Sequence, residues 1–394
     1  MKIKPQAIVF FFLILLSILF IYKNSNDTKE HSTTTLHSLD GPYIYSKENQ
    51  ISILRVAQKK DSSFFIKKQT FPRGEKTAFS TYVNNTDKDS FTFTLAQQYN
   101  IPLAVHEPKG KILVTSDIEG NFNAFHSILI GNNVIDDDYN WTFGSGHLVI
   151  CGDMMDRGTE VLPCLWLLYK LDQEAKKHNG QVHFILGNHD VMNLQLDTRY
   201  IKSKYLELAK IVSGITDDKK KAYEFLMSDT NELVKWIKSK NTIEKIGNNL
   251  FVHGGISDLL IDTGLTLEET NSYIRKNIRK NLIRNPGKDE YANLIFGNKG
   301  PLWYRGLVKN HSDYEKINEA TLNSILQFYG VQHIIVGHTI VDNEVTSDFN
   351  GKVIRVDIKQ PKEKFTGKGQ ALLIENDGYY RVNDLGEKFK MDIN

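Results

Sequence analysis

The sequence predicts an α/β fold in which a largely buried sheet is covered by helices. From about Lys109 onward, short apolar runs alternate with helical stretches, which is the pattern of βα units. The runs are almost continuously hydrophobic, as is typical of strands that are buried on both faces. A polar, glycine-bearing turn follows each of five runs. These observations predict one α/β domain over residues 105–394.

Seven apolar runs are the expected strands of this domain. They are Lys111–Thr115, His147–Cys151, Val182–Leu186, Leu250–Val252, His333–Val336, Val353–Val356 and Ala371–Ile374. The segment Val161–His178 has the apolar spacing of an amphipathic helix. Residues 198–245 are mostly helical in pattern and heavily charged, so we expect them to form a helical insertion.

The N-terminus contains the one segment without globular character. Ala7 to Tyr22 is an uninterrupted apolar run that follows Lys2 and Lys4. At ~1.5 Å per residue the run is slightly short for a ~30 Å hydrocarbon core, so residues 1–22 are interpreted as a membrane anchor or a signal segment. The run ends without the small residues of a cleavage site, which favours a single retained anchor. Under both interpretations the catalytic domain is expected outside the cytoplasm, anchored or, after signal cleavage, secreted.

Two further segments precede the α/β domain. Residues 23–40 are polar without apolar periodicity, which is typical of a flexible linker. Residues 41–104 are predicted to form a small β-rich region, because Ile51–Val56 and Phe91–Leu95 alternate between apolar and polar residues. No cluster of chemically active residues lies in that region of the sequence, so we expect it to serve packing.

Composition limits the classes of function. The chain is 40% hydrophobic and 24% charged, which excludes wholesale disorder. Its 49 Lys and Arg against 47 Asp and Glu give a net charge of +2, so no nucleic-acid partner is expected. It has two cysteines, which excludes a thiolate-rich zinc site. A metal site in this protein would have to use His, Asp, Glu and Asn.

The side chains suited to chemistry follow directly after the predicted strands. The five turns are Asp117-Ile118-Glu119-Gly120-Asn121, Gly152-Asp153-Met154-Met155-Asp156-Arg157-Gly158, Gly187-Asn188-His189-Asp190, His253-Gly254-Gly255 and Gly337-His338-Thr339. Ligands bind beyond the carboxyl ends of strands in α/β sheets, so the turns are expected to converge. Convergence would gather six oxygen and imidazole donors: Asp117, Glu119, Asp153, Asn188, His253 and His338. Such donors suit Mn, Fe, Zn or Mg, and the carboxylates would repel one another without cations.

This series of turns resembles the calcineurin-like metallophosphoesterases, within them the phosphoprotein phosphatase branch. That branch carries the motifs GDxHG, GDxxDRG, GNHE, HGG and a later histidine, and the turns above are similar to them in the same order. The segment Gly300-Pro301-Leu302-Trp303-Tyr304-Arg305-Gly306 also resembles the Shewanella-like bacterial-type protein phosphatases. The resemblance covers about Lys109 to Ile374. It implies a two-sheet βα sandwich with a binuclear metal site above the strand ends.

The resemblance also implies which residues bind the two metal ions. It gives three ligands to the first ion: Asp117, Glu119 and Asp153. It gives four to the second, with Asp153 bridging the two ions: Asp153, Asn188, His253 and His338. Two divalent cations ~3.5–4 Å apart lower the pKa of a water between them, which makes hydroxide available for in-line attack on phosphorus.

Four further residues receive roles in catalysis from the same resemblance. His189 would protonate the leaving oxygen, and Asp156 would orient its imidazole. Arg157 and Arg305 would bind the phosphate oxygens, for which the planar guanidinium is well shaped. Stacking on Trp303 or Tyr304 is the alternative for Arg305. Arg199 is a weaker candidate for substrate contact.

The sequence departs from the family pattern at two positions. Glu119 stands where the family usually has a histidine ligand, and Asp190 stands where GNHE has Glu. An anionic oxygen donor favours harder metals, so two Mn ions are expected, with Fe, Zn and Mg left open. The alternative is that Glu119 turns away and one metal ion binds weakly or not at all.

Three functions are compatible with these residues. The first is a metal-dependent phosphomonoesterase, such as a protein phosphatase acting on phospho-Ser/Thr or phospho-Tyr. The second is a phosphodiesterase or nucleotide hydrolase on the same fold. The third is a non-catalytic binding module, which would require the loss of His189, Asp156 or the bridging ligand, yet all three residues are present.

Overall fold

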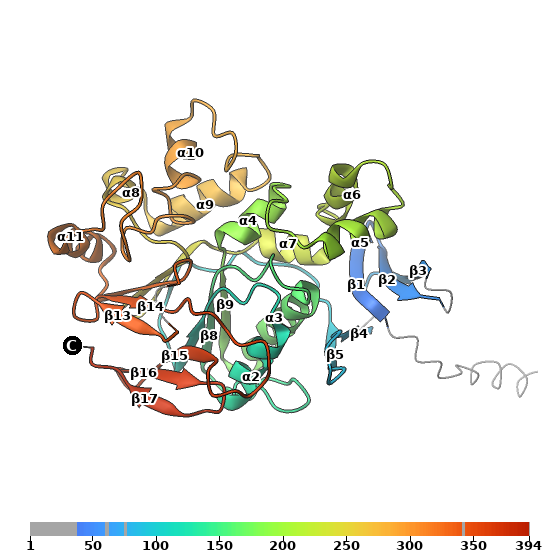
Figure 1. Ribbon diagram of the computed structural model, residues 1–394, viewed down its shortest axis with the longest axis horizontal. Coiled ribbons are helices and arrows are strands. Elements are labelled where there is room, and N and C mark those ends of the chain that lie inside the picture. The colour runs from blue at the N-terminus through green and yellow to red at the C-terminus, as the bar shows by residue number, and fades with distance from the viewer. Residues whose placement is uncertain (1–37, 60–62, 75–76, 341–342, 394) are drawn as a thin grey trace, which may run out of the picture. The chain divides into compact units, whose positions relative to one another are not determined.

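Two six-stranded sheets form the centre of the molecule (Figure 1). The computed structural model describes residues 38–59, 63–74, 77–340 and 343–393. The first sheet contains β6 (Val105–His106), β10 (Ile243–Ile246), β11 (Asn249–Val252), β12 (His333–Val336), β13 (Thr346–Asp348) and β14 (Val353–Arg355). The second contains β7 (Ile112–Thr115), β8 (His147–Cys151), β9 (Gln181–Ile185), β15 (Gln370–Glu375), β16 (Gly378–Asn383) and β17 (Lys388–Lys390). The predicted two-sheet α/β sandwich is confirmed.

The order of the strands brings the predicted turns to one edge of the sandwich. In the second sheet β7, β8 and β9 are parallel neighbours, and in the first sheet β11, β12 and β14 are parallel neighbours. Parallel neighbours end at the same edge of a sheet, so the turns that follow them lie side by side. In the second sheet, β15, β16 and β17 continue beyond β7 in antiparallel fashion. In the first sheet, β13 pairs antiparallel to β14 at one edge, and β10 and β6 follow β11 toward the other edge.

The sheets are held together by apolar side chains that point between them. One buried cluster contains alternate residues of both sheets, among them Val114, Val149, Ile185, Phe251, Ile335 and Ile354. Alternation follows from the strand repeat, in which successive side chains point to opposite faces. Burial of these side chains, each worth about 1.5–3 kcal/mol, is the main force that fixes the two sheets against each other.

Helices cover the outer faces. Against the second sheet lie α2 (Phe122–Gly131) and α3 (Val161–Ala175), whose side chains share one buried core with those of β7 and β8. A 3₁₀ turn, Lys176–His178, continues α3, so the predicted helix 161–178 is present as two pieces. The other helices of the domain are α4 (Asn188–Leu194), α8 (Asp258–Asp262), α9 (Leu267–Asn277), α10 (Glu290–Ile295) and α11 (Glu319–Tyr329).

The predicted insertion is helical for most of its length. It contains α5 (Ser203–Ser213), α6 (Lys219–Leu226) and α7 (Glu232–Lys238). Its last residues, from Ile243, belong instead to the sheet strand β10. The alternation Ile243-Glu244-Lys245-Ile246 carries two charges in four residues, and for that reason the apolar signal of a strand is weak there.

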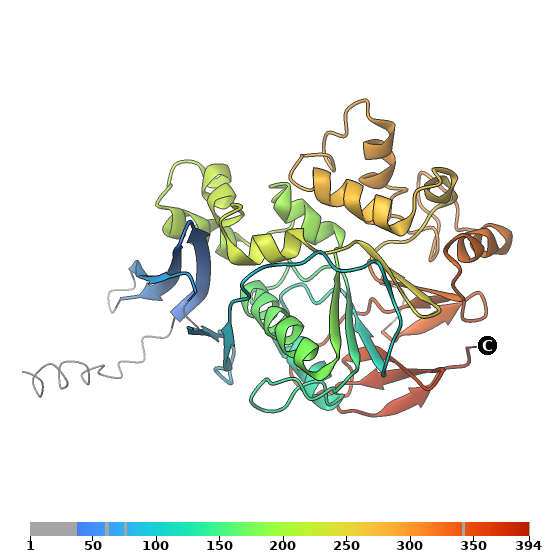
Figure 2. The ribbon, with the colours of Figure 1, turned by 180° about the vertical axis from the view of Figure 1, so that it is seen from behind.

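A small antiparallel sheet packs on the insertion (Figure 2). It consists of β1 (Ser38–Lys47), β2 (Gln50–Gln58) and β3 (Phe64–Pro72), and a separate hairpin contains β4 (Ala78–Tyr82) and β5 (Ser90–Thr94). Ring centroids of Tyr45 and Phe225 lie 5.1 Å apart, and the Ser46 backbone N–H donates to the Thr230 carbonyl over 2.8 Å. The N-terminal strands therefore support the insertion, as a packing role predicts.

The predicted N-terminal segments are only partly described. Residues 1–37 lie outside the described residues. They include the whole predicted anchor or signal segment, 1–22, and most of the predicted linker, 23–40. The last three linker residues, Ser38 to Asp40, are part of β1. No helix in the described ranges is long and apolar enough to cross a membrane. The division of the chain at residues 104 and 105 stays a prediction.

Candidate active site

The turns after β7, β8, β9, β11 and β12 bring all six predicted metal ligands into one cluster. The His338 backbone N–H donates to Asp117 Oδ2 over 3.0 Å, which joins the turns after β12 and β7. His253 Nε2 lies 3.1 Å from Asp153 Oδ2 and 2.9 Å from Asn188 Oδ1. Asp117 and Glu119 are partly buried, and the other four are buried.

Strained backbone turns these side chains inward. Asp117, Glu119, Asp153 and His338 have φ values of 50°, 47°, 57° and 64°. Left-handed backbone costs a non-glycine residue about 1–3 kcal/mol and clusters at functional sites. Four of the six predicted ligands share this conformation. The strain favours a function for the cluster over a packing role.

Two glycines allow the turns to close around the cluster. A Cβ on Gly152 would lie 2.3 Å from His253 Nδ1, and a Cβ on Gly187 would lie 2.1 Å from Asp153 Oδ1. Both distances are far inside van der Waals contact. Any larger residue would therefore displace a predicted ligand.

The imidazoles of His253 and His338 each have one ring nitrogen available to bind a cation. His253 Nδ1 donates to the Cys151 carbonyl over 2.7 Å, which directs Nε2 at Asp153 and Asn188. A hydrogen bond to the other ring nitrogen is the usual support of a metal-binding histidine. His338 Nε2 is buried and has no hydrogen-bond partner in the described structure. An orphaned buried nitrogen is costly, and a metal ion would satisfy it.

Asp153 lies at the centre of the cluster. It belongs to two groups whose donor atoms lie within 4.8 Å of one another, one with His253 and His338 and one with Glu119 and His189. Burial alone would raise the pKa of Asp153, but the charges of His253 and His189 lower it, so the carboxylate is ionised. A central, ionised carboxylate is what the predicted bridging role requires.

The aspartates around His253 also favour its protonated form. Burial lowers its pKa, and the charges of Asp153 and Asp117 raise it to about 10. The imidazole therefore holds a second proton when no cation neutralises the carboxylates. Metal binding would release that proton, as it does at histidine ligands in general.

Asp190 has a structural role in the turn after β8. Its carboxylate accepts four backbone hydrogen bonds, from Gly187 (2.9 Å), Asp153 (2.9 Å), Met154 (3.1 Å) and Met155 (3.2 Å). The shorter Asp side chain thus fixes the loop that carries Asp153 and fills the place of the Glu in GNHE.

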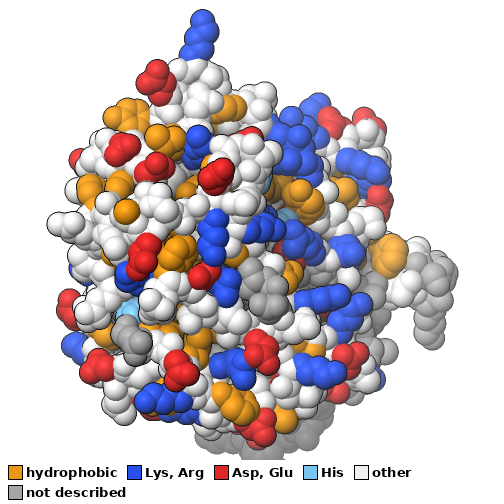
Figure 3. Space-filling view, turned by 60° about the vertical axis from the view of Figure 1, so that its left-hand side comes forward, with side chains coloured by type: hydrophobic (Ala, Val, Ile, Leu, Met, Phe, Trp, Pro, Cys, Tyr) orange, Lys and Arg blue, Asp and Glu red, His pale blue; other side chains and the backbone are white. Residues whose placement is uncertain are grey.

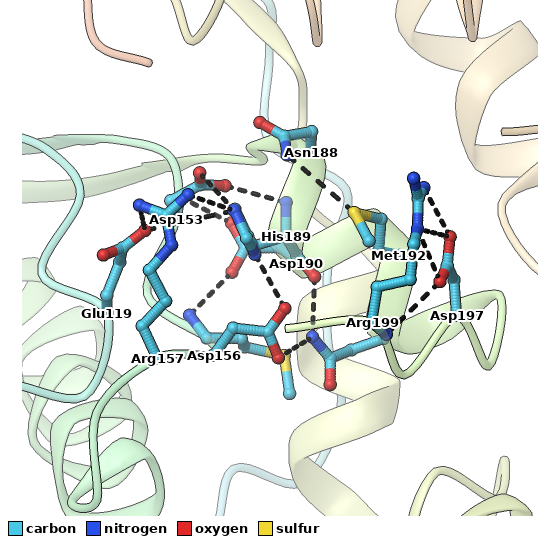
Figure 4. A network of polar contacts seen from close by, with 12 residues as sticks. Glu119, Asp153, Asp156, Arg157, Asn188, His189, Asp190, Met192, Asp197 and Arg199 are labelled. Atoms are coloured by element: carbon cyan, nitrogen blue, oxygen red, sulfur yellow. Dashed lines mark hydrogen bonds and ion pairs between the residues drawn. The ribbon is translucent and has the colours of Figure 1, made fainter. Parts of the chain in front are cut away.

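His189 and Asp156 form the predicted pair beside the cluster (Figure 4). His189 Nδ1 lies 2.7 Å from Asp156 Oδ2, and Nε2 faces the cluster, 3.8 Å from Asp153 Oδ2. Burial lowers the pKa of His189, but Asp153 and Asp156 raise it above its ordinary value. This shift favours retention of the proton that a general acid must deliver.

The two predicted phosphate-binding arginines lie on either side of the cluster. Arg157 is half exposed and pairs with Glu119 Oε1 over 2.7 Å (Figure 4). Arg305 donates to the His338 carbonyl over 2.6 Å and to Thr339 Oγ1 over 2.9 Å. Trp303 packs edge-on against His338 rather than under Arg305. Both guanidinium groups are thus held by side chains or backbone of the site itself.

Arg199 is directed away from the cluster. Its guanidinium donates to Asp197 Oδ2 over 2.9 and 2.7 Å (Figure 4). Arg284 binds the same carboxylate over 2.9 Å. The geometry therefore commits Arg199 to an ion pair with the buried carboxylate of Asp197.

A cavity of about 900 Å³ borders the cluster, and its wall includes Asp117, Glu119 and Arg157. Lys202, Lys359 and Lys362 also line it. Lys and Arg side chains are spread widely over one face of the molecule, among acidic and apolar ones (Figure 3). Cations at the wall of the cavity suit an anionic substrate.

Three residues near the site are absent from the functional residues that the sequence predicts. Asp357 follows the predicted strand 353–356, so its position at a strand end was a usable signal, although no glycine-bearing turn accompanies it. Asn193 donates to Asp156 Oδ1 over 2.8 Å, and the Tyr223 hydroxyl donates to Asn193 Oδ1. Contacts between residues so distant in the sequence leave no local pattern.

Comparison with known proteins identifies the family. Residues 110–342 match the family model of the calcineurin-like phosphoesterases. The chain belongs to this family. It is therefore a hydrolase of phosphoric esters, and membership implies divalent metal ions. The assignment of individual ligands and catalytic residues stays a prediction.

Two relatives of the chain are protein phosphatases by name. The chain is 27% identical over 314 residues to Shewanella-like protein phosphatase 2 of Arabidopsis thaliana, covering 70% of this chain and 78% of that protein. It is 30% identical over 231 residues to Shewanella-like protein phosphatase 1 of Plasmodium berghei, covering 58% of this chain and 61% of that protein. The crystal structure of a cold-active protein-tyrosine phosphatase of a psychrophilic Shewanella species superimposes with a TM-score of 0.75 at 32% identity, covering 89% of this chain and 98% of that one. These similarities support phosphatase activity.

Proposed function

We propose that this protein is a binuclear, metal-dependent phosphomonoesterase that removes phosphate from phosphorylated proteins. One observation carries the proposal: the Asp156–His189 pair, joined over 2.7 Å, directs the other ring nitrogen, Nε2, at the ligand cluster, where it lies 3.8 Å from Asp153 Oδ2 and 3.2 Å from Arg157 Nη2. An acid in that place serves a reaction with a poor leaving group, such as an alkoxide or phenoxide leaving phosphorus.

The chain's own residues divide the reaction between them. Arg157 and Arg305 would bind the non-bridging phosphate oxygens and orient the ester. His189 Nε2 would deliver its proton to the leaving oxygen, and Asp156 would hold the ring and stabilise its charged form. When bound, two metal ions would activate the attacking water and offset the negative charge at phosphorus.

The relatives guide the choice of substrate. The Shewanella structure is that of a protein-tyrosine phosphatase, and two of the relatives are named protein phosphatases. We therefore propose phosphorylated proteins as substrates, carrying phosphotyrosine or phosphoserine and phosphothreonine. A phosphodiesterase or nucleotide hydrolase on the same fold is the alternative.

A substrate panel tests this proposal. Purified full-length protein in mild detergent, with added Mn²⁺, is assayed on phosphotyrosine and phosphoserine peptides, nucleotides, cyclic nucleotides and bis-phosphodiesters. We expect the phosphopeptides to give the highest kcat/KM, and the Asp156→Asn variant to lose activity on all of them. Preference for diesters or nucleotides would support the alternative, and inactivity on the whole panel would contradict both.

We propose Mn²⁺ as the metal. The cluster offers carboxylates and imidazoles without thiolates, and Glu119 adds an anionic oxygen beside Asp117 and Asp153. Burial and the charges of those two aspartates raise the pKa of Glu119 to about 8, so a cation would be needed to keep it ionised at neutral pH. Hard, oxygen-rich sites favour Mn²⁺ or Mg²⁺ over softer metals.

We further propose that residues 1–22 anchor the enzyme in a membrane, with its catalytic domain outside the cytoplasm. The apolar run from Ala7 to Tyr22 without a cleavage site supports this placement. In fractionated cells the full chain is expected to sediment with membranes and to resist carbonate extraction. Recovery of a soluble protein that retains its N-terminus would contradict the anchor, and recovery without residues 1–22 would support a cleaved signal.

A further inference from the structure

Asp357 lies at the end of a sixth strand on the active-site edge. β14 is the parallel neighbour of β12, with Arg355 opposite Val336, and the Val356 backbone N–H donates to the Val336 carbonyl over 2.9 Å. This register brings Asp357 out of β14 at the level where His338 leaves β12. The strand-end rule that gathers the other ligands therefore applies to Asp357 as well.

The side chain of Asp357 is buried without a partner. It is 3% exposed, and in the described structure its Oδ1 has no hydrogen-bond partner. It lines the same cavity as Asp117 and Glu119. A buried carboxylate with an orphaned oxygen is costly unless a proton or a cation compensates it.

The carboxylates that repel Asp357 are those of the predicted first metal site. The charge of His253 attracts it, and three carboxylates repel it: Asp117 most strongly, then Glu119 and Asp153. These three are the residues to which the first metal ion is assigned. Asp190, by contrast, is buried in the same region but is satisfied by four backbone N–H donors.

We propose that Asp357 is a fourth carboxylate ligand of the first metal ion, together with Asp117, Glu119 and Asp153. The inference rests on the proposed binuclear site and extends it. It gives the first site an all-oxygen ligand set without imidazole, whereas the second site keeps His253 and His338. Such a site prefers Mn²⁺ or Mg²⁺ to Zn²⁺.

The test is metal binding by the Asp357→Asn variant of the full-length protein. After treatment with EDTA, Mn²⁺ is titrated calorimetrically into wild type and variant. We expect one of two Mn²⁺ sites to weaken by at least ~10-fold and the other to keep its affinity. We also expect the metal-free variant to melt no lower than wild type, because a repelling carboxylate has been removed, and to gain less Tm from Mn²⁺.

Asp384→Asn is the matched control. Asp384 is fully buried and also has an orphaned Oδ1, but its carboxylate accepts from Thr366 N–H over 2.9 Å, outside the cavity. This variant should lower the metal-free Tm and leave both Mn²⁺ affinities unchanged. Two results for Asp357→Asn would overturn the inference and leave the binuclear proposal standing. One is unchanged Mn²⁺ affinity at both sites, and the other is a lowered metal-free Tm together with the full rise in Tm on adding Mn²⁺. Failure of wild type to bind two Mn²⁺ ions would overturn the binuclear proposal as well.

Discussion

Two clusters of imidazoles and carboxylates lie in the described part of the chain, and they differ in whether their polar atoms are paired. The second one, here called the paired cluster, consists of His106, His147, His183 and Glu244. His183 bridges it, with Nε2 2.8 Å from His147 Nδ1 and Nδ1 2.6 Å from Glu244 Oε2. Asn241 donates to the other Glu244 oxygen over 2.9 Å. Among the described residues, no buried polar atom of these four lacks a hydrogen-bond partner.

If only the types of ligand residue were considered, the paired cluster would also be classified as a metal site. Donor atoms of His106, His183 and Glu244 lie within 4.8 Å of one another, as close as those of the active-site groups. However, its members lie within strands β6, β8, β9 and β10, and their side chains contact one another between the two sheets. The active-site cluster instead sits beyond strand ends, on strained turns, beside a cavity and with His338 Nε2 orphaned. Unpaired donors at strand ends, rather than donor types, distinguish a metal site here.

The largest expected effect comes from Asp153→Asn, set against Glu244→Gln in the paired cluster. Asp153 is the one predicted ligand of both ions, so its change should remove most bound metal and reduce kcat/KM by more than the ~10²–10⁴-fold of a lost general acid. Glu244→Gln should leave the metal content unchanged. Elemental analysis of both purified variants measures this difference. Metal near two ions per chain in Asp153→Asn would contradict the bridging role.

His189→Ala should separate acid catalysis from metal binding. We expect kcat to fall ~10²–10⁴-fold on an alkyl phosphate, because no group then protonates the alkoxide. The loss should be much smaller on nitrophenyl phosphate, whose leaving group needs little protonation. Metal content and Tm should stay close to those of wild type. Equal losses on the two substrates would argue against His189 as the acid.

The comparison also explains what the sequence can and cannot predict. Strand ends such as Cys151 followed by Asp153 are local patterns, so the five turns and their order were predictable from sequence. His183 and Glu244 lie inside strands, and a lone polar residue in a strand gives no sign of its partner across the sandwich. The same holds for Asn193 and Tyr223, which meet through tertiary packing. What could not be predicted is pairing between distant elements, which depends on how the layers stack.

Glu119→His should change metal preference. The substitution replaces an anionic oxygen with a neutral nitrogen, which makes the two-metal site more positive and softer. We expect the EDTA-treated wild type to recover best with Mn²⁺ and the variant to shift toward Zn²⁺ or Fe²⁺. The acidic limb of the pH–rate profile should move to lower pH, because a more positive site stabilises hydroxide better. Identical preference and identical limbs would mean that Glu119 does not bind metal.

The paired cluster should make stability sensitive to acid. Burial and the neighbouring His183 lower the pKa of His147 to about 4. Between pH 6.5 and 4 the unfolded chain therefore binds a proton that the folded chain excludes, so stability falls as the pH falls. His106 opposes this trend, because Glu244 raises its pKa despite burial. When the pH is lowered from 7 to 5 in EDTA, the Tm of His147→Asn should fall by about 2–4 °C less than the Tm of wild type. Parallel Tm curves would contradict the assignment.

The smallest effect is expected where the insertion reaches the active site. Tyr223 on α6 is 3% exposed, and its hydroxyl donates to Asn193 Oδ1, while Asn193 donates to Asp156 Oδ1 over 2.8 Å. Burial raises the pKa of Tyr223, so the hydroxyl stays a donor. Without it Asn193 is free to rotate and Asp156 loses support, so Tyr223→Phe should lower kcat about 3- to 10-fold on an alkyl phosphate, the scale of one hydrogen bond.

The control for this positioning role is Tyr43→Phe. Tyr43 borders the same apolar pocket as Tyr223, and its hydroxyl donates to Asp40 Oδ1 over 2.7 Å, away from the catalytic pair. Both variants lose one buried hydrogen bond, so both should lose a similar amount of Tm. Only Tyr223→Phe should reduce turnover of the alkyl phosphate more than that of nitrophenyl phosphate, because only it weakens the support of the acid. If the two variants lower both rates equally, Tyr223 stabilises the insertion without positioning His189.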